Sequence, residues 1–288
     1  GCNFADLLHH APEKDVSVEG LGMAFVNAAR AASPFAEGWA KLIELGFSVL
    51  PILPAEYDDG SSAGWTPGHP AHGKAPGQFT RGEWRLMHDW ERYCERMPTE
   101  FEYPMWARNW PNANIGIPVG TTVRSEAGDV LKLIAFDIDA PDTDLVDEIL
   151  RIVPWTPNKK KGRKGQTNFY LADMAISNAP YNLDTSDPKK KIRALDILAY
   201  HRQTVAPPSI HPETGLPYEW IDEPGLQHVS KLPILTADHI GSVEELLSMR
   251  GWKGHKAAKS FTAVPRETHE GFTGGGSGGD GYFDETKA

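Results

Sequence analysis

The chain has 288 residues, of which 40% are hydrophobic and 24% are charged, a composition typical of a globular protein with a substantial core. No apolar run approaches the roughly 18 residues that a membrane span needs. The sequence also shows no charged start followed by an apolar stretch, the pattern of a secretory signal. The two cysteines, Cys2 and Cys94, support neither a disulfide framework nor a cysteine-based zinc site. We therefore expect a protein of the reducing cytoplasm with no membrane partner.

The net charge of −10 argues against a protein that coats nucleic acid through an overall positive charge. Basic residues are nevertheless concentrated in two runs, at 159–164 and 189–193. An acidic body with local basic strips suits an enzyme that collects metal ions at carboxylates and holds phosphates elsewhere. Each run taken alone is more simply explained as a solvated loop.

In the first half of the chain, apolar residues at helical spacing alternate with segments rich in turn residues. The expected elements are a helix over 25–32, a helix from Phe35 to a C-cap at Gly46, a strand over 47–50 that ends at Pro51, a loop over 55–79 and a helix over 82–96.

From Asn112 onward, short apolar runs separated by turns replace this pattern, and a capping-box sequence at 242–245 predicts the start of a late helix. The expected elements are strands over 115–119, 130–138, 166–171, 191–198 and 203–206, and helices over 144–153 and 243–249. Alternating strands and helices predict an α/β or α+β domain with a mostly antiparallel or mixed sheet.

We place this domain at 34–250, after an N-terminal segment, 1–33. The residues that follow, 251–288, lose apolar periodicity and contain a glycine-rich stretch at 274–281, so we expect a flexible linker or tail there.

Two aspartates, Asp137 and Asp139, stand at the end of an apolar strand. Side chains alternate across a strand, so Ala135 and both carboxylates share one face. Two ionised carboxylates this close are unfavourable without a cation, and a hard ion such as Mg²⁺ or Mn²⁺ supplies the compensation. The alternative is a strand that has already ended and a polar loop that carries the aspartates, but Phe136 and Ile138 favour a strand that continues.

A third carboxylate, Asp196, lies near the end of another predicted strand and shares a face with Ile192 and Ala194. Adjacent strands lie roughly 5 Å apart, so three carboxylates converge at one sheet edge if this strand neighbours the first acidic one. Two metal ions held there can activate an attacking 3′-hydroxyl and stabilise a leaving pyrophosphate. The sequence leaves the adjacency of the two strands open.

A glycine- and lysine-rich segment, 159–170, separates the two acidic strands. Gly165 lets the backbone approach a ligand closely. Arg163 and Lys164 can neutralise phosphate oxygens, and Thr167 can donate a hydrogen bond. The spacing of a Walker loop is missing, and a basic hairpin turn is the alternative interpretation.

Ser209 and His211 follow in a proline-rich segment with a hairpin turn predicted at Thr214-Gly215. The prolines stiffen the chain, so a rigid loop would present both side chains. His211 can contact a triphosphate or assist a proton transfer. A structural loop, whose serine and histidine bond to the backbone, explains the segment equally well.

Taken in order, these segments resemble the archaeo-eukaryotic primase superfamily, in particular the bifunctional primase-polymerase domains of phages and plasmids. The similarity spans residues 36–220. The segments that carry it are Gly46-Phe-Ser-Val-Leu-Pro51, Lys74-Ala-Pro76, Trp110-Pro-Asn-Ala-Asn-Ile-Gly-Ile-Pro-Val-Gly120, Phe136-Asp-Ile-Asp139, the lysine-glycine segment, Asp196 and Pro207-Pro-Ser-Ile-His-Pro-Glu-Thr-Gly215.

The resemblance implies a catalytic sheet of the RNA-recognition-motif type beside a smaller N-terminal α/β unit. It implies template-directed nucleotidyl transfer from dNTPs or NTPs, with a single-stranded DNA template and a primer as partners. The implied ligands of two Mg²⁺ or Mn²⁺ ions are Asp137, Asp139 and Asp196. Many members of the superfamily carry a helicase further along the chain, and the glycine-rich end is compatible with a linker to one.

The resemblance also suggests how the nucleotide is held. Thr167 stands where the second motif of the superfamily usually carries a histidine that contacts the phosphates. Arg163, Lys164 or His211 are therefore expected to compensate, and Lys74 is expected to reach the nucleotide.

Three other functions explain parts of the pattern. A phosphatase of the haloacid dehalogenase type would use Asp137 as its nucleophile, but Ala140 and Pro141 replace the glycine and threonine that normally follow. A metal-dependent glycosyltransferase accounts for the paired aspartates and leaves Asp196 unexplained. A non-catalytic module that binds a replication origin conflicts with three intact carboxylates.

Overall fold

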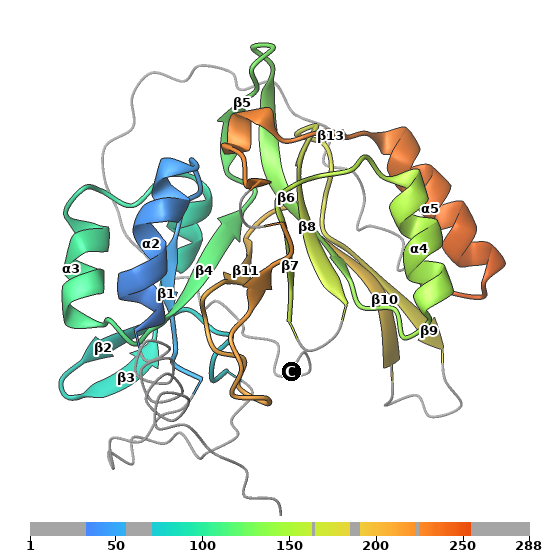
Figure 1. The fold of residues 1–288 in the computed structure, drawn as a ribbon. Helices are drawn as coiled ribbons and strands as arrows, with labels where there is room; N and C mark the ends of the chain where they lie inside the picture. The colour runs from blue at the N-terminus through green and yellow to red at the C-terminus, as the bar shows by residue number, and fades with distance from the viewer. Residues whose placement is uncertain (1–32, 56–70, 163–164, 185–190, 223–224, 255–288) are drawn as a thin grey trace, which may run out of the picture.

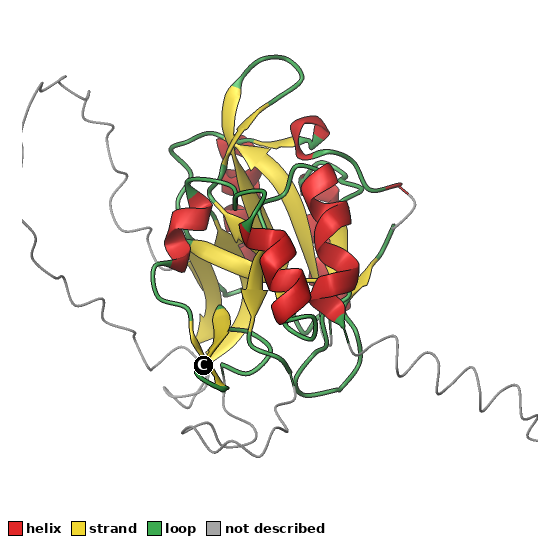
Figure 2. Ribbon diagram, turned by 90° about the vertical axis from the view of Figure 1, so that its left-hand side faces the viewer, coloured by secondary structure: helices red, strands yellow, loops and turns green. Residues whose placement is uncertain are grey.

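The computed structural model describes residues 33–55, 71–162, 165–184, 191–222 and 225–254. The helix expected over 25–32 and the glycine-rich stretch lie outside these ranges. Figure 1 shows two units side by side, a smaller one built around β1, β4 and β11 and a larger one built around β6, β8 and β10. Turned by 90°, the molecule shows helices lying over the strands of these sheets (Figure 2). None of the helices in the described ranges has the length and apolarity for a bilayer span.

The smaller unit contains a three-stranded antiparallel sheet in the order β1-β4-β11. Its elements are α2 (Pro34–Glu44), β1 (Leu50–Ile52), β2 (Gly77–Thr80), β3 (Glu83–Leu86), η1 (Trp90–Cys94), α3 (Glu102–Asn109), β4 (Asn114–Val119) and β11 (Arg202–Ala206). The helix predicted from Phe35 to a C-cap at Gly46 is confirmed as α2: it has proline at its first position, and Gly46 beyond its end has a φ of +83°.

Two predictions for this unit are wrong. The first strand lies at Leu50–Ile52 and includes Pro51, which is tolerated because β1 is the edge strand of the three-stranded sheet. The helix expected over 82–96 is instead a strand of the β2–β3 hairpin followed by a short 3₁₀ helix. Trp84 and Met87 have helical spacing, yet they contribute to the same buried core from a strand and from the residue just after it.

The larger unit is a nine-stranded sheet, ordered β12-β7-β8-β6-β10-β9-β14, with β5 paired to β6 and β13 paired to β8. Its strands are β5 (Thr122–Arg124), β6 (Val130–Ile138), β7 (Lys159–Lys161), β8 (Gln166–Ala172), β9 (Ala179–Asp184), β10 (Lys191–Leu198), β12 (Glu219–Trp220), β13 (Ile234–Leu235) and β14 (Lys253–Gly254). All pairs are antiparallel except β8 with β13. The mixed α+β class is thereby confirmed. The predicted β6 and β10 have the bounds expected, whereas β7 and β9 were not predicted.

Two helices, α4 (Thr143–Ile152) and α5 (Ala237–Met249), cover one face of the large sheet (Figure 1). The predicted α4 is confirmed, and Asp142 caps it by accepting a 3.0 Å hydrogen bond from the backbone N–H of Asp144. Helix α5 ends as predicted but begins earlier. Its capping box is formed by Thr236 and His239 and not by the serine at 242.

Strand β6 divides the hydrophobic core because its residues are buried on both faces. Ile134, Phe136 and Ile138 pack on the side of α4 and α5. Leu133 and Ala135 pack on the opposite side, in the cluster that contains the small sheet. The odd-numbered face of β6 therefore points at the smaller unit, and any side chain that continues this face lies between the two units.

Prediction from the start of α3. Glu102 accepts hydrogen bonds from Tyr93 (2.8 Å), Arg96 (2.8 and 3.1 Å) and the backbone of Thr99 (2.7 Å). The hydrogen bonds of Arg96, more than any other contact, lower the pKa of Glu102 from 4.5 to about 2. A carboxylate with a lowered pKa stabilises the fold above its unfolded pKa and loses that contribution as the pH falls towards its folded pKa. We expect Glu102→Gln to lower the unfolding temperature at neutral pH, and the difference from the unsubstituted protein to shrink as the pH falls from about 5 towards 3. A difference that stays constant over this range would contradict the ionic origin of the stabilisation.

Candidate active site

A single row of side chains crosses four strands of the large sheet. Lys160 on β7 pairs with Thr167 on β8, Thr167 pairs with Asp137 on β6, and Asp137 pairs with Asp196 on β10. Residues directly opposite each other on antiparallel strands project from the same face, with Cβ atoms about 5 Å apart. The register therefore brings a lysine, a threonine and two aspartates together on the face that points at the smaller unit.

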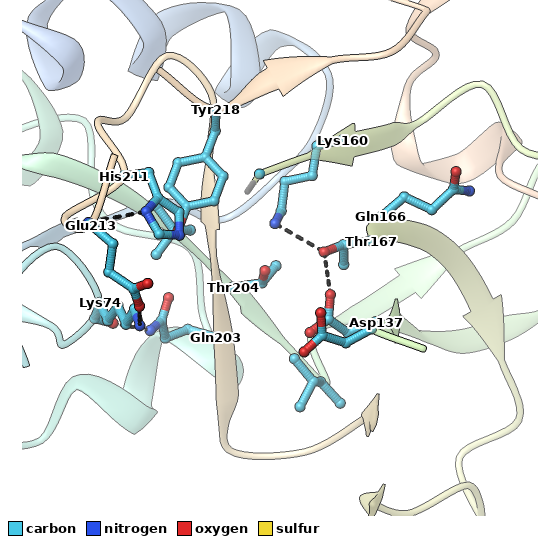
Figure 3. A pocket seen from close by; sticks show the side chains of 14 residues that line it. Lys74, Asp137, Lys160, Gln166, Thr167, Gln203, Thr204, His211, Glu213 and Tyr218 are labelled. Carbon is cyan, nitrogen blue, oxygen red and sulfur yellow. Dashed lines mark hydrogen bonds and ion pairs between the residues drawn. The ribbon is translucent and has the colours of Figure 1, made fainter. Parts of the chain in front are cut away.

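Hydrogen bonds connect three members of this row (Figure 3). The Thr167 hydroxyl donates to Oδ1 of Asp137 at 2.6 Å, and the Lys160 ammonium donates to the Thr167 hydroxyl at 3.0 Å. Thr167 thus relays the positive charge of Lys160 towards the Asp137 carboxylate. These hydrogen bonds also fix the rotamers of Lys160 and Asp137, since each side chain is bonded to the Thr167 hydroxyl.

A cavity of about 360 Å³ lies in front of this row, between the large sheet, β11 and the loop that follows β11. Asp137 lines it from β6 and Lys160 from β7, while Lys74, His211 and Glu213 line it from the opposite side (Figure 3). The lining residues are Lys74, Asp137, Asp139, Lys160, Gly162, Gln166, Thr167, Leu198, Gln203, Thr204, Val205, His211, Glu213 and Tyr218.

Asp137 and Asp139 line the cavity because they continue the odd-numbered face of β6 beyond its apolar part. Asp137 is the last odd-numbered residue of the strand. Asp139 follows the strand end, where its backbone N–H donates to the carbonyl of Ala194 at 2.9 Å. The two carboxylates predicted to share a face thus line one cavity.

Asp196 lies next to Asp137 but is engaged differently. Its carboxylate accepts a hydrogen bond from Arg193, with which it forms an ion pair, and it is not among the residues that line the cavity. The pKa of Asp196 is raised to about 6, mainly by burial and to a smaller extent by the negative charge of Asp137, against the opposing effect of Arg193. Loss of hydration therefore outweighs the arginine, and negative charge is incompletely compensated here.

The donor set suits a hard divalent ion in part. Asp137 and Asp139 offer carboxylate oxygens to one cavity, and oxygen ligands are those that Mg²⁺ and Mn²⁺ prefer. Across the described ranges, however, no three His, Cys, Asp or Glu side chains form a group with metal-holding geometry. Asp196, the third predicted ligand, pairs with Arg193 and does not line the cavity.

Lys160 is the cation that lies deepest in the cavity wall. It is 5% exposed, and burial lowers its pKa to about 8, against the opposing effect of Asp137. Its ammonium lies 5.2 Å from the centre of the Tyr218 ring. Tyr218 in turn lies beside His211, with ring centres 5.3 Å apart.

The residues proposed from the sequence to bind the nucleotide divide into those that line the cavity and those that do not. Lys74, Thr167 and His211 line it. Lys74 forms an ion pair with Glu213 at 3.5 Å, and Nδ1 of His211 accepts from the backbone of Glu213 at 3.1 Å. Arg163 and Lys164 lie outside the described residues.

Ser209 is fully buried and does not line the cavity. Its hydroxyl accepts a 2.7 Å hydrogen bond from the backbone N–H of Ile115 on β4. Asn114 adds two hydrogen bonds to Ile210, of 2.8 and 2.9 Å. These contacts anchor the loop that carries His211 to the small sheet, and the predicted turn at Thr214-Gly215 is confirmed by a 2.9 Å hydrogen bond from Gly215 to His211.

Sequence reasoning missed several lining residues. Lys160 belonged to a run in which Arg163 and Lys164 were the candidate phosphate ligands, and three consecutive lysines carry little strand signal. Its alternation with Lys159 and Lys161 becomes informative only when β7 is known to be a strand. Gln203 and Tyr218 are single polar or aromatic residues whose place in the cavity depends on how the two units meet.

A comparison with protein families gives one match. The model of the family described as bifunctional DNA primase/polymerase, N-terminal, matches residues 40–235, which is more than half of the 288-residue chain. The matched range includes the whole cross-strand row and the loop after β11. No curated protein matches the chain at a significant level.

Prediction from the end of β6. Gly165 has a φ of +56°, and a Cβ added to it would lie 1.9 Å from the carbonyl oxygen of Ile138. Gly82 also has positive φ, +84°, but nothing lies within 4 Å of an added Cβ. Each Gly→Ala substitution should cost about 1–2 kcal/mol for the left-handed backbone. Gly165→Ala should cost a further 1–3 kcal/mol, roughly, because backbone next to Asp139 must shift. Urea unfolding of both variants measures the difference, and equal losses would show that Ile138 imposes no constraint.

Proposed function

Because the chain belongs to the bifunctional DNA primase/polymerase N-terminal family, we propose that it performs its DNA-directed nucleotidyl transfer in the cavity in front of Asp137 and Asp139. The observation that carries the proposal is the cross-strand row, which brings carboxylates and a buried lysine together at one wall of a polar cavity. Primases and polymerases act on DNA and nucleotides, and both bring phosphate groups to this site.

Nucleotidyl transfer forms a bond between a hydroxyl oxygen and the α-phosphorus of a nucleoside triphosphate and releases pyrophosphate. The attacking hydroxyl loses a proton, and negative charge increases on the leaving phosphates. A suitable site therefore places acidic groups near the hydroxyl and cations near the leaving group. Asp137 and Asp139 supply the first requirement, while Lys160, Lys74 and His211 surround the cavity with basic groups.

Two Mg²⁺ or Mn²⁺ ions are part of this proposal. Asp137 and Asp139 would hold them, and Asp196 would join if its carboxylate exchanged Arg193 for an ion. Such ions, when bound, activate the attacking hydroxyl and stabilise the pyrophosphate. The Thr167 hydroxyl orients the Asp137 carboxylate, since it donates to Oδ1.

The partners follow from the reaction. We propose a single-stranded DNA template with a primer, and dNTPs or NTPs as substrates. A phage or plasmid replicon and a helicase partner stay predictions that depend on the resemblance, and a cytoplasmic setting stays a prediction from the sequence. The family match favours this function over the phosphatase, although both would use Asp137.

Prediction for the carboxylates. We expect template-dependent primer extension with dNTPs and Mg²⁺ or Mn²⁺, and we expect Asp139→Asn to abolish it without unfolding the protein. Asp142→Asn is the matched control, because it removes a carboxylate three residues away and asparagine caps a helix as well as aspartate does. Gel-resolved extension of a labelled primer measures both variants. Extension that persists in Asp139→Asn would refute the site, and hydrolysis of p-nitrophenyl phosphate without extension would favour the phosphatase.

Prediction for the metal ions. We expect Mn²⁺ to raise the unfolding temperature of the protein, because a ligand that binds only the folded state stabilises it by mass action. The double variant Asp137→Asn, Asp139→Asn should lose this increase. In EDTA its unfolding temperature should stay close to that of the unsubstituted protein, since it removes both the repulsion between Asp137 and Asp196 and the negative charge that faces Lys160 across Thr167. Differential scanning fluorimetry measures both effects, and an undiminished Mn²⁺ response in the double variant would place the ion elsewhere.

A further inference from the structure

We propose that Lys160 binds the phosphate chain of the incoming nucleoside triphosphate through its ammonium group. This inference rests on the proposed polymerase function and assigns a specific contact within its site. The sequence pointed to other residues for this contact, and Lys160 was not among them.

The ammonium of Lys160 is buried with few polar partners. Lys160 is 5% exposed, yet within the described ranges no carboxylate lies at ion-pair distance and its one hydrogen-bond acceptor is the Thr167 hydroxyl. A lysine ammonium has three N–H donors, so Thr167 uses only one of them. A buried charge is costly unless anionic or polar partners compensate it. An anion that enters the cavity would provide this compensation.

The ammonium of Lys160 lies near the carboxylate of Asp137, with one hydroxyl group between them. Thr167 separates Lys160 from Asp137, so a positive and a negative group flank one hydroxyl along the row. In nucleotidyl transfer the attacked phosphorus and the departing pyrophosphate belong to one chain of phosphates. Acidic and basic groups are therefore needed within a few ångströms of each other, and this row places them so.

The two lysines next to Lys160 on β7 already have carboxylate partners. Lys159 and Lys161 flank Lys160 on β7 and form ion pairs with Asp222 at 3.0 Å and Glu219 at 2.9 Å. Neither of them lines the cavity. Strand alternation thus directs one lysine of the three into the cavity and the other two away from it.

The surroundings hold the Lys160 side chain in place. The Tyr218 ring lies 5.2 Å from its ammonium. A Cβ on Gly162 would lie 2.7 Å from Cε1 of Tyr218, so a glycine at this position leaves room for the ring. A lysine that is already ordered loses little side-chain entropy on binding a ligand, which favours affinity.

The test compares triphosphate and monophosphate binding in Lys160→Met, with Lys161→Met as the matched control on the same strand. Isothermal titration calorimetry with dATP and dAMP, then with dGTP and dGMP, is performed in the presence of Mg²⁺. We expect Lys160→Met to weaken triphosphate binding roughly 10-fold or more, the usual effect of losing a charge-assisted hydrogen bond. Monophosphate binding should change less than about twofold, and Lys161→Met should bind both as the unsubstituted protein does.

Primer extension provides the second readout. In Lys160→Met the KM for dNTPs should rise, and Lys160→Arg should restore part of the affinity because it keeps a cation. Lys160→Gln gives the same comparisons if methionine at this position prevents folding.

The results separate the Lys160 contact from the polymerase function. Unchanged triphosphate affinity in Lys160→Met would overturn this inference while extension by the unsubstituted protein still supports the polymerase function. Equal weakening of triphosphate and monophosphate, together with a smaller Mn²⁺ stabilisation, would also overturn it, because Lys160 would then act by positioning Asp137 through Thr167. Selective loss of triphosphate binding in a protein that extends no primer would uphold the contact and reject the polymerase.

Discussion

The site depends on two carboxylates that face each other across neighbouring strands. Asp137 and Asp196 are direct partners in the antiparallel register of β6 and β10, an arrangement that is unfavourable when both are ionised. The surrounding residues compensate each carboxylate separately. Arg193 pairs with Asp196, while Thr167 donates to Asp137 and is itself supported by Lys160. The fold therefore maintains concentrated negative charge where β6 and β10 meet, which is the condition under which divalent cations bind strongly.

The position of this charge follows from how β6 is buried. Both faces of the strand are covered over most of its length, one by α4 and α5 and the other by the core shared with the small sheet. At Asp137 the second core ends, and β11 with its following loop leaves a polar cavity. That loop is held to β4 by the hydrogen bonds of Ser209 and Asn114, which fix the far wall of the cavity to the small sheet. Asp137 and Lys160 belong to the wall formed by the large sheet, and Lys74 and His211 face them from the side of the smaller unit.

The sequence predicted those parts of the molecule whose patterns are local and strong. The bounds of β6 and β10 emerged correctly because their apolar residues alternate or run continuously, and the shared face of Asp137 and Asp139 follows from strand geometry alone. The sequence could not decide whether β10 lies next to β6. That adjacency depends on pairing between two segments whose aspartates are 59 residues apart. The helix expected over 82–96 failed for a related reason, since apolar spacing does not distinguish a helix from a hairpin when both bury the same side chains. Lys160 was missed because a strand of three lysines is defined by its partner β8 and not by its own propensity.

Cross-strand pairing also explains how a side chain on one strand can occupy the space beside a position on the neighbouring strand. Opposed positions on two antiparallel strands lie about 5 Å apart, so a side chain on β7 reaches the same space as its partner on β8. At Thr167 the short hydroxyl side chain leaves that space to Lys160, whose longer chain passes it and ends in the cavity wall. A motif defined by one strand's sequence records only the residue that stands at that position and not the neighbour that projects beside it. In a sheet whose register is fixed on both sides, as β8 is by β6 and β7, a basic group therefore needs only to stand in the correct cross-strand row, whichever strand supplies it.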